Sequence, residues 1–128
     1  MAKSQNTKVD FTIKATSYLG INSYGDVMIG DNAFEYYNEK NVEDYIQIPW
    51  EQVDYISASV LFKRKIVRFA IFTKSAGHFS FSTRDNKKTL QMIRKYIPLE
   101  KMHTSPNLFD IIKNGLKAIY KRIFNTKK

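Results

Sequence analysis

Two histidines, His78 and His103, are the imidazoles of this chain, and it contains no cysteine. A protein that carries a phosphoryl group on a side chain needs an activated histidine or cysteine. His78 stands between Gly77 and Phe79, which cannot activate it, and its alternating run predicts a ring that points into solvent. Gly-x-Ser-x-Gly, P-loop and His-Glu-x-x-His motifs are also missing. The sequence therefore predicts no catalytic residue, no cofactor and no enzymatic activity.

Four acidic residues in one stretch are the candidates for a metal site: Glu35, Glu39, Glu43 and Asp44. They are spread over a strand end and a loop, without the regular spacing of oxygen ligands that a calcium loop requires. We interpret them as solvated surface charge and predict no metal.

Basic residues cluster where a hairpin turn is expected, at Lys63, Arg64 and Lys65, with Arg68 close behind. Like charges packed at a turn repel one another. They either keep the turn soluble and discourage edge pairing, or they contact phospholipid headgroups or an acidic protein face.

Length and charge limit the class of protein. The chain has 128 residues and a formal net charge of +9, which is enough for one small basic domain. The lack of cysteine fits a reducing compartment. No apolar run approaches the ~20 residues of a membrane span, and the first residues lack a secretion signal. We expect a cytoplasmic protein.

The elements that must position these groups follow from the hydrophobic periodicity. Period-two alternation predicts seven strands, and helical spacing predicts an amphipathic helix over 86–97 with Asp85 as N-cap and Pro98 as its end. The predicted strands are 9–15, 27–29, 33–37, 45–50, 53–62, 66–73 and 78–82. Residues 1–98 are therefore expected to form an α+β domain, a pleckstrin-homology or GRAM-like antiparallel sheet barrel closed by the helix. Trp50 and Tyr55 either fill its core or line its mouth.

The C-terminal part, 99–128, is predicted to be a connector followed by a basic amphipathic helix. Ser105 fits an N-cap and Pro106 the first helical position. Residues 105–128 contain six basic residues and one acid, so they hold five of the nine surplus charges. The expected contact residues on this helix are Phe109, Ile112, Lys113, Leu116, Lys117, Ile119 and Lys121. The lysines lie beside a broad apolar face.

This apolar face has three possible uses. It packs on its own domain, it docks on an anionic membrane or a membrane protein, or it forms a homodimer. The predicted domain already has a closing helix, so the C-terminal helix is surplus to the barrel.

Several blocks of the chain, in order and at compatible spacing, resemble the ManO-type mannose operon protein family. The blocks are Asn6–Asp10, Lys14–Gly20, Ser23–Gly25, Met28–Asp31, Asp44–Trp50, Val53–Ile56 and Ser59–Lys63. Members of that family are small bacterial proteins encoded beside mannose-class sugar phosphotransferase systems. The resemblance implies a cytoplasmic protein that acts near a sugar permease, and it transfers no active site.

The resemblance and the charge together give an expected function. We expect a non-enzymatic accessory protein, peripheral to the inner face of the cell membrane. It would bind the membrane part of a mannose-class permease, or anionic lipid beside it, and modulate sugar uptake. The contact surface would be the C-terminal helix, with Lys63, Arg64 and Lys65 as a second patch. The alternative is a basic DNA-binding regulator of the sugar-uptake operon, which the lack of a helix-turn-helix pair disfavours.

Overall fold

The structure is a computed structural model that describes residues 3–61 and 65–106. Its elements are eight strands, one α-helix and two short 3₁₀ turns. The strands are β1 (Val9–Ser17), β2 (Ser23–Gly30), β3 (Ala33–Asn38), β4 (Tyr45–Pro49), β5 (Val53–Leu61), β6 (Lys65–Thr73), β7 (His78–Thr83) and β8 (Met102–Pro106). The helix is α1 (Asn86–Ile93), and the 3₁₀ turns are η1 (Trp50–Gln52) and η2 (Leu99–Lys101). The predicted α+β class and all seven predicted strands are confirmed.

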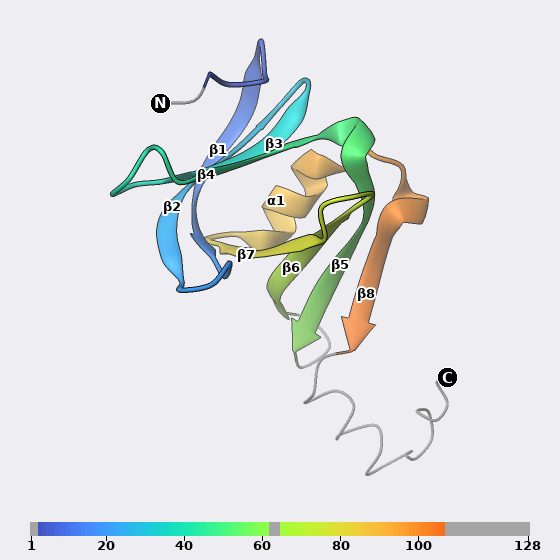
Figure 1. Ribbon diagram of the computed structural model, residues 1–128. Coiled ribbons are helices and arrows are strands. Elements are labelled where there is room, and N and C mark those ends of the chain that lie inside the picture. The colour runs from blue at the N-terminus through green and yellow to red at the C-terminus, as the bar shows by residue number, and fades with distance from the viewer. Residues whose placement is uncertain (1–2, 62–64, 107–128) are drawn as a thin grey trace, which may run out of the picture.

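All eight strands form one sheet in the order β4-β3-β2-β1-β7-β6-β5-β8. Neighbouring strands pair antiparallel except for β5 and β8, which run parallel (Figure 1). The prediction of a barrel is wrong, because the sheet does not close and β4 and β8 remain the two edges of the described sheet. A closed barrel would pair β4 with β5, and β8 already occupies that side of β5.

The strand β8 also corrects the prediction for residues 99–106. A connector and the first residues of a helix were expected there, but Met102 pairs with Ile56 and Pro106 with Val60 in a parallel ladder. Ser105 and Pro106 therefore end a strand and do not begin a helix. The open edge of β5 offers hydrogen-bonding groups that outweigh the local capping signal. The rest of the predicted C-terminal helix lies outside the described residues.

The core is built from the inward-facing residues of the strands and one side of α1. Phe34, Phe69 and Phe81 are fully buried and touch one another, with ring centroids 4.9 Å apart for Phe34 and Phe81 and 6.0 Å apart for Phe69 and Phe81. Leu90 and Ile93 of α1 pack into the same cluster. Phe34 comes from β3, whereas Phe69 and Phe81 come from β6 and β7. Burial of these large side chains therefore holds the two halves of the bent sheet together.

The start of α1 is fixed by side-chain hydrogen bonds. The Asp85 carboxylate accepts from the Lys88 amide at 3.0 Å, which confirms it as the N-cap. The side chain of Asn86 donates to the Ile66 carbonyl at 2.8 Å and accepts from the Thr83 amide at 2.7 Å. The helix ends at Ile93, earlier than predicted, although Ile97 is still buried.

Trp50 fills the core, and Tyr55 does not. Trp50 is 9% exposed, donates from Nε1 to the Gly30 carbonyl at 2.9 Å, and stacks on Tyr96 with 5.2 Å between centroids. Tyr55 is half-buried outside the core cluster. Of the two roles expected for these residues, core filling is therefore confirmed for Trp50 only.

Candidate interaction surface

One end of the sheet is marked by the last residue of β5 and the first residue of β6. Lys65, at the start of β6, is exposed and pairs with Leu61, the last residue of β5. Pro106, the last residue of β8, pairs with Val60 at the same end (Figure 1). The last described residue of β8 therefore lies beside the end of β5 and the start of β6. We call this region the basic end.

A polar cleft of about 460 Å³ opens at the basic end, between the start of β6, the end of β7 and the start of α1. Lys65, Arg84 and Lys87 line it, together with Asp85. No ion pair engages these three cations within the described part of the chain. Three cations against the single carboxylate of Asp85 make the cleft predominantly positive.

Among the sequence-predicted contact residues, the structure describes Lys65 alone. Lys63, Arg64 and the residues predicted on the C-terminal helix lie outside the described residues. Arg68, which the sequence placed with the basic turn, lies over the Tyr18 ring with its guanidinium carbon 4.5 Å from the centroid. That cation–π contact fixes Arg68 on the outer face of the sheet.

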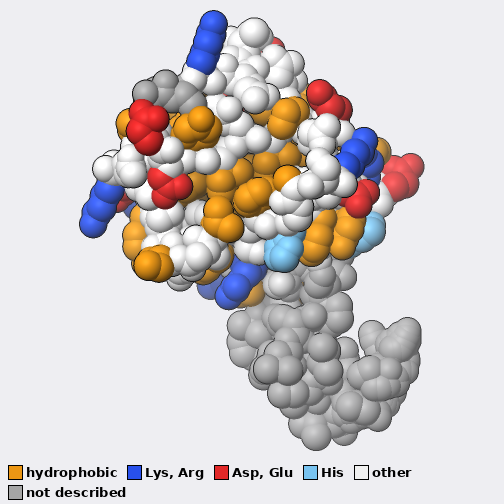
Figure 2. All heavy atoms as spheres, in the orientation of Figure 1, with side chains coloured by type: hydrophobic (Ala, Val, Ile, Leu, Met, Phe, Trp, Pro, Cys, Tyr) orange, Lys and Arg blue, Asp and Glu red, His pale blue; other side chains and the backbone are white. Residues whose placement is uncertain are grey.

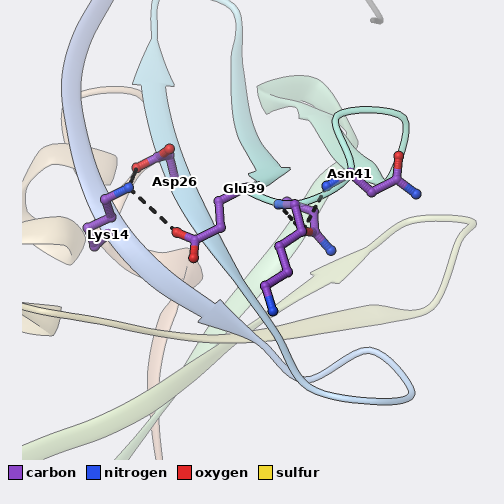
Figure 3. A network of polar contacts seen from close by, with 6 residues as sticks. Lys14, Asp26, Glu39 and Asn41 are labelled. Carbon is purple, nitrogen blue, oxygen red and sulfur yellow. Dashed lines mark hydrogen bonds and ion pairs between the residues drawn. The ribbon is translucent and has the colours of Figure 1, made fainter.

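The acidic residues of the predicted surface stretch are engaged locally. Lys14 lies between Asp26 and Glu39, with nitrogen–oxygen distances of 3.1 and 3.7 Å (Figure 3). The hydrogen bond and charge of Asp26 raise the pKa of Lys14, with a smaller contribution from Glu39. The positive charge of Lys14 is therefore balanced by two carboxylates, and it adds nothing to the basic end. Glu39, Glu43 and Asp44 are exposed, which agrees with their interpretation as surface charge.

Glu35 corrects that interpretation, because its side chain is fully buried on β3. Its Oε1 accepts from the Ser4 hydroxyl at 2.7 Å, and its Oε2 accepts from the Gln5 amide at 2.6 Å. The segment before β1 thus covers the face of β3 that the alternation predicts to be wet. The position of Glu35 inside the apolar run 33–37 is the one sequence signal that could have indicated a buried carboxylate.

A row of stacked rings crosses the outer face of β8, β5, β6 and β7. His103 stacks on Tyr55 at 5.0 Å, Tyr55 on Phe72 at 4.5 Å, and Phe72 on His78 at 4.8 Å between centroids. Figure 2 shows the two histidines in pale blue with hydrophobic side chains between them. Both histidines are exposed, as predicted for His78. The row ties β8 to the sheet, and neither ring has a carboxylate partner in the described contacts.

No three histidine, aspartate or glutamate residues among those described are close enough together to hold a metal ion. Within residues 3–61 and 65–106, no helix has the length and apolar character to cross a membrane.

Comparisons with known proteins show a family and a fold. A family model described as a domain of unknown function (DUF956) matches residues 1–116. Among solved structures, the crystal structure of the C-terminal domain of an unknown protein from Leishmania infantum is similar, with a TM-score of 0.62 and 9% sequence identity. The match covers 70% of this chain and 83% of that one, and at this identity it shows the fold alone. No curated protein matches the chain.

Proposed function

The chain belongs to the DUF956 family of domains of unknown function, and we propose that it is a non-enzymatic accessory protein that docks its basic end on an anionic membrane surface. There it binds the membrane part of a mannose-class sugar phosphotransferase permease and modulates sugar uptake. The observation that carries the proposal is the position of the positive cleft at the end of the sheet where β5 ends, β6 begins and β8 ends.

Charge supplies the physical support for membrane docking. The net charge is +9, and five of these surplus charges lie in residues 105–128, which begin at the basic end. A Lys or Arg near an anionic leaflet contributes about 1 kcal/mol. We propose that the unpaired cations of the cleft and the basic residues of 105–128 act on the same membrane surface.

The permease and the cytoplasmic location rest on the resemblance to the ManO-type family. The fold is compatible with a binding role, and we propose that the sheet is an open variant of the pleckstrin-homology or GRAM arrangement. In this variant β8 pairs with the edge of β5 to which β4 would have to pair in a closed barrel. The lack of enzymatic activity remains part of the proposal. Its support is that both histidines are taken up in ring stacking rather than in contact with a base or a nucleophile.

Vesicle sedimentation with a charge-reversed cleft tests the docking surface. The double variant Arg84→Glu with Lys87→Glu removes two cations of the cleft. The matched control, Lys3→Glu with Lys74→Glu, makes the same charge change at two exposed residues that do not line the cleft, one beside Gln47 of β4 and one in the turn after β6. Two lost contacts of about 1 kcal/mol each should weaken binding to phosphatidylglycerol vesicles about 30-fold. The control should bind nearly as the wild type does, and equal losses in both variants would contradict a localised surface.

The permease is tested separately by affinity capture from detergent-solubilised membranes with the full-length protein. Recovery of permease subunits by the wild type, and their loss with Ile112→Asp, supports the proposal. Sequence-selective binding of operon promoter DNA that persists at physiological salt would instead favour the DNA-binding regulator.

A further inference from the structure

The sheet leaves an open seam between its edge strand β4 and the hairpin formed by β6 and β7. A groove of about 490 Å³ occupies this seam, and we call it the seam groove. Figure 2 shows hydrophobic side chains gathered in the middle of this face of the molecule. None of the residues that line the groove is charged, although the chain carries a net charge of +9. The seam groove is therefore a surface of a different kind from the basic end.

All five residues of β4, from Tyr45 to Pro49, line the groove. Successive side chains of a strand point to opposite faces of the sheet, so a groove that touches every residue must run along the strand's open edge. β4 pairs with β3 on its other side. The edge itself is thus the wall of the groove.

The register shows which backbone groups face the groove. The Asn38 amide donates to the Asp44 carbonyl, and the Trp50 amide donates to the Asn32 carbonyl, both at 3.1 Å. Hydrogen bonding alternates along an antiparallel pair, so the even-numbered residues of β4 bond to β3. The N–H and C=O groups of Tyr45 and Gln47 consequently point away from β3 and into the groove. A row of unsatisfied ladder groups is a template for another strand.

The opposite wall is held in place by its own hydrogen bonds. The Thr73 amide donates to the Gly77 carbonyl and the Ala76 amide to Thr73 Oγ1, both at 2.8 Å. The Lys74 amide donates to the Gln52 carbonyl at 3.0 Å, which ties the turn to η1 beside β4. The floor consists of core side chains, among them Ile48 and Phe79. The groove is therefore formed before any ligand arrives.

We propose that the seam groove binds an extended, uncharged segment of a protein partner, which adds to β4 as a strand. Its backbone would pair with Tyr45 and Gln47, and every second side chain would be apolar and enter the groove. A second copy of the chain fits poorly, because the edge strand of a folded copy brings a neighbouring strand that would collide with the β6–β7 hairpin. A single extended segment has no such neighbour.

The binding geometry specifies a probe. Gln47 donates to Tyr37 Oη and to the Lys3 carbonyl, so its side chain lies on the outer face. We take the partner strand to run antiparallel to β4, so that partner residues opposite Tyr45 and Gln47 lie on that face too and their N–H groups bond to β4. The alternate residues point toward Ile46 and Ile48. In a capped peptide of alternating threonine and valine, the threonines should take the outer face and the valines the groove.

The experiment is a nuclear magnetic resonance titration of the full chain with this Thr-Val peptide. Saturable shifts of the Tyr45 and Gln47 amides are expected. N-methylation of the threonines should weaken binding at least tenfold, whereas N-methylation of the valines should leave it within about threefold. Ala76→Glu, which puts a charge into the groove, should abolish binding, and Gln91→Glu on the exposed side of α1 should not.

Other outcomes overturn the proposal. These are the absence of saturable shifts, or equal effects of the two N-methylated peptides. Concentration-dependent dimerisation that Ala76→Glu removes would assign the groove to a second copy. A shift of the Gln47 amide in Leu116→Asp without added peptide would assign it to the chain's own C-terminal segment. None of these results bears on the basic end, so the two proposals stand or fall separately.

Discussion

The carboxylate of Glu35 is buried on β3, and its two oxygens accept from Ser4 and from the Gln5 amide. We expect Glu35→Ala to lower the free energy of unfolding by about 2 kcal/mol, because it removes charge-assisted hydrogen bonds and leaves the Gln5 amide without its acceptor. Urea unfolding measures this loss, and hydrogen exchange at Gln5 should accelerate. Glu51→Ala removes an exposed carboxylate and should change stability by less than about 0.5 kcal/mol. Equal effects of the two variants would contradict the role of Glu35.

Tyr96 joins the region after α1 to β1 through a hydrogen bond from its hydroxyl to the Asp10 carboxylate. This bond raises the pKa of Tyr96 from 10.0 to about 12 and is the main cause that lowers the pKa of Asp10. The neutral phenol is favoured in the folded state. Its contribution to stability is therefore complete below pH 10.0 and is lost as pH rises toward about 12.

Ultraviolet titration of the tyrosines tests this bond. Tyr96→Phe should remove a component that titrates at about pH 12. It should also make stability less dependent on pH above 10.0. Tyr24→Phe, which removes an exposed ring remote from Asp10, should leave that component in place. Its persistence in Tyr96→Phe would refute the bond. On the acid side, the contribution of Asp10 is present above the ordinary carboxyl range and is lost as pH falls through its lowered pKa.

At the scale of elements, alternation predicted β1 to β7 because each of these strands buries one face. Val27 and Ile29 of β2 are fully buried, for example, and Met28 between them is not. β3 departs from this rule, since the segment before β1 covers its second face over Glu35. β8 could not be predicted, because a short edge strand is determined by the open backbone of β5 rather than by its own side chains. Ser105 and Pro106 favour a helix start locally, but pairing with β5 is stronger and both residues belong to a strand.

Proline substitution tests β8 as a strand. In a parallel edge strand, alternate N–H groups bond to the neighbour and the others point to solvent. His103→Pro and Thr104→Pro should therefore differ in unfolding free energy by about 1–2 kcal/mol, because only one of them removes a ladder hydrogen bond. His103→Ala separates the loss of the stacked ring from the loss of the N–H. Identical effects of the two proline variants would contradict the ladder between β5 and β8.

At the scale of the whole molecule, the sequence could not place the end of residues 102–106 beside the end of β5 and the start of β6. That position depends on β8 running parallel to β5, so that Pro106 lies opposite Val60. The sequence also did not predict that Arg84 lines the positive cleft. Arg84 directly follows β7, and it comes close to Lys65 and Lys87 only because α1 packs against β6. The seam groove depends on the barrel remaining open, which the strand pattern does not reveal.

The net charge of +9 leads us to expect that membrane binding of the whole molecule depends on salt concentration. If charge at the basic end drives membrane binding, raising the salt from about 0.1 M to 1 M shortens the Debye length from about 10 Å to about 3 Å. Binding to phosphatidylglycerol vesicles should then fall at least tenfold, and binding to phosphatidylcholine vesicles should be weak at both salt concentrations. Arg84→Glu with Lys87→Glu should reduce this salt dependence, because fewer cations remain to be screened. Salt-independent binding that is equal on both kinds of vesicle would show that apolar insertion, rather than charge, holds the protein at the membrane.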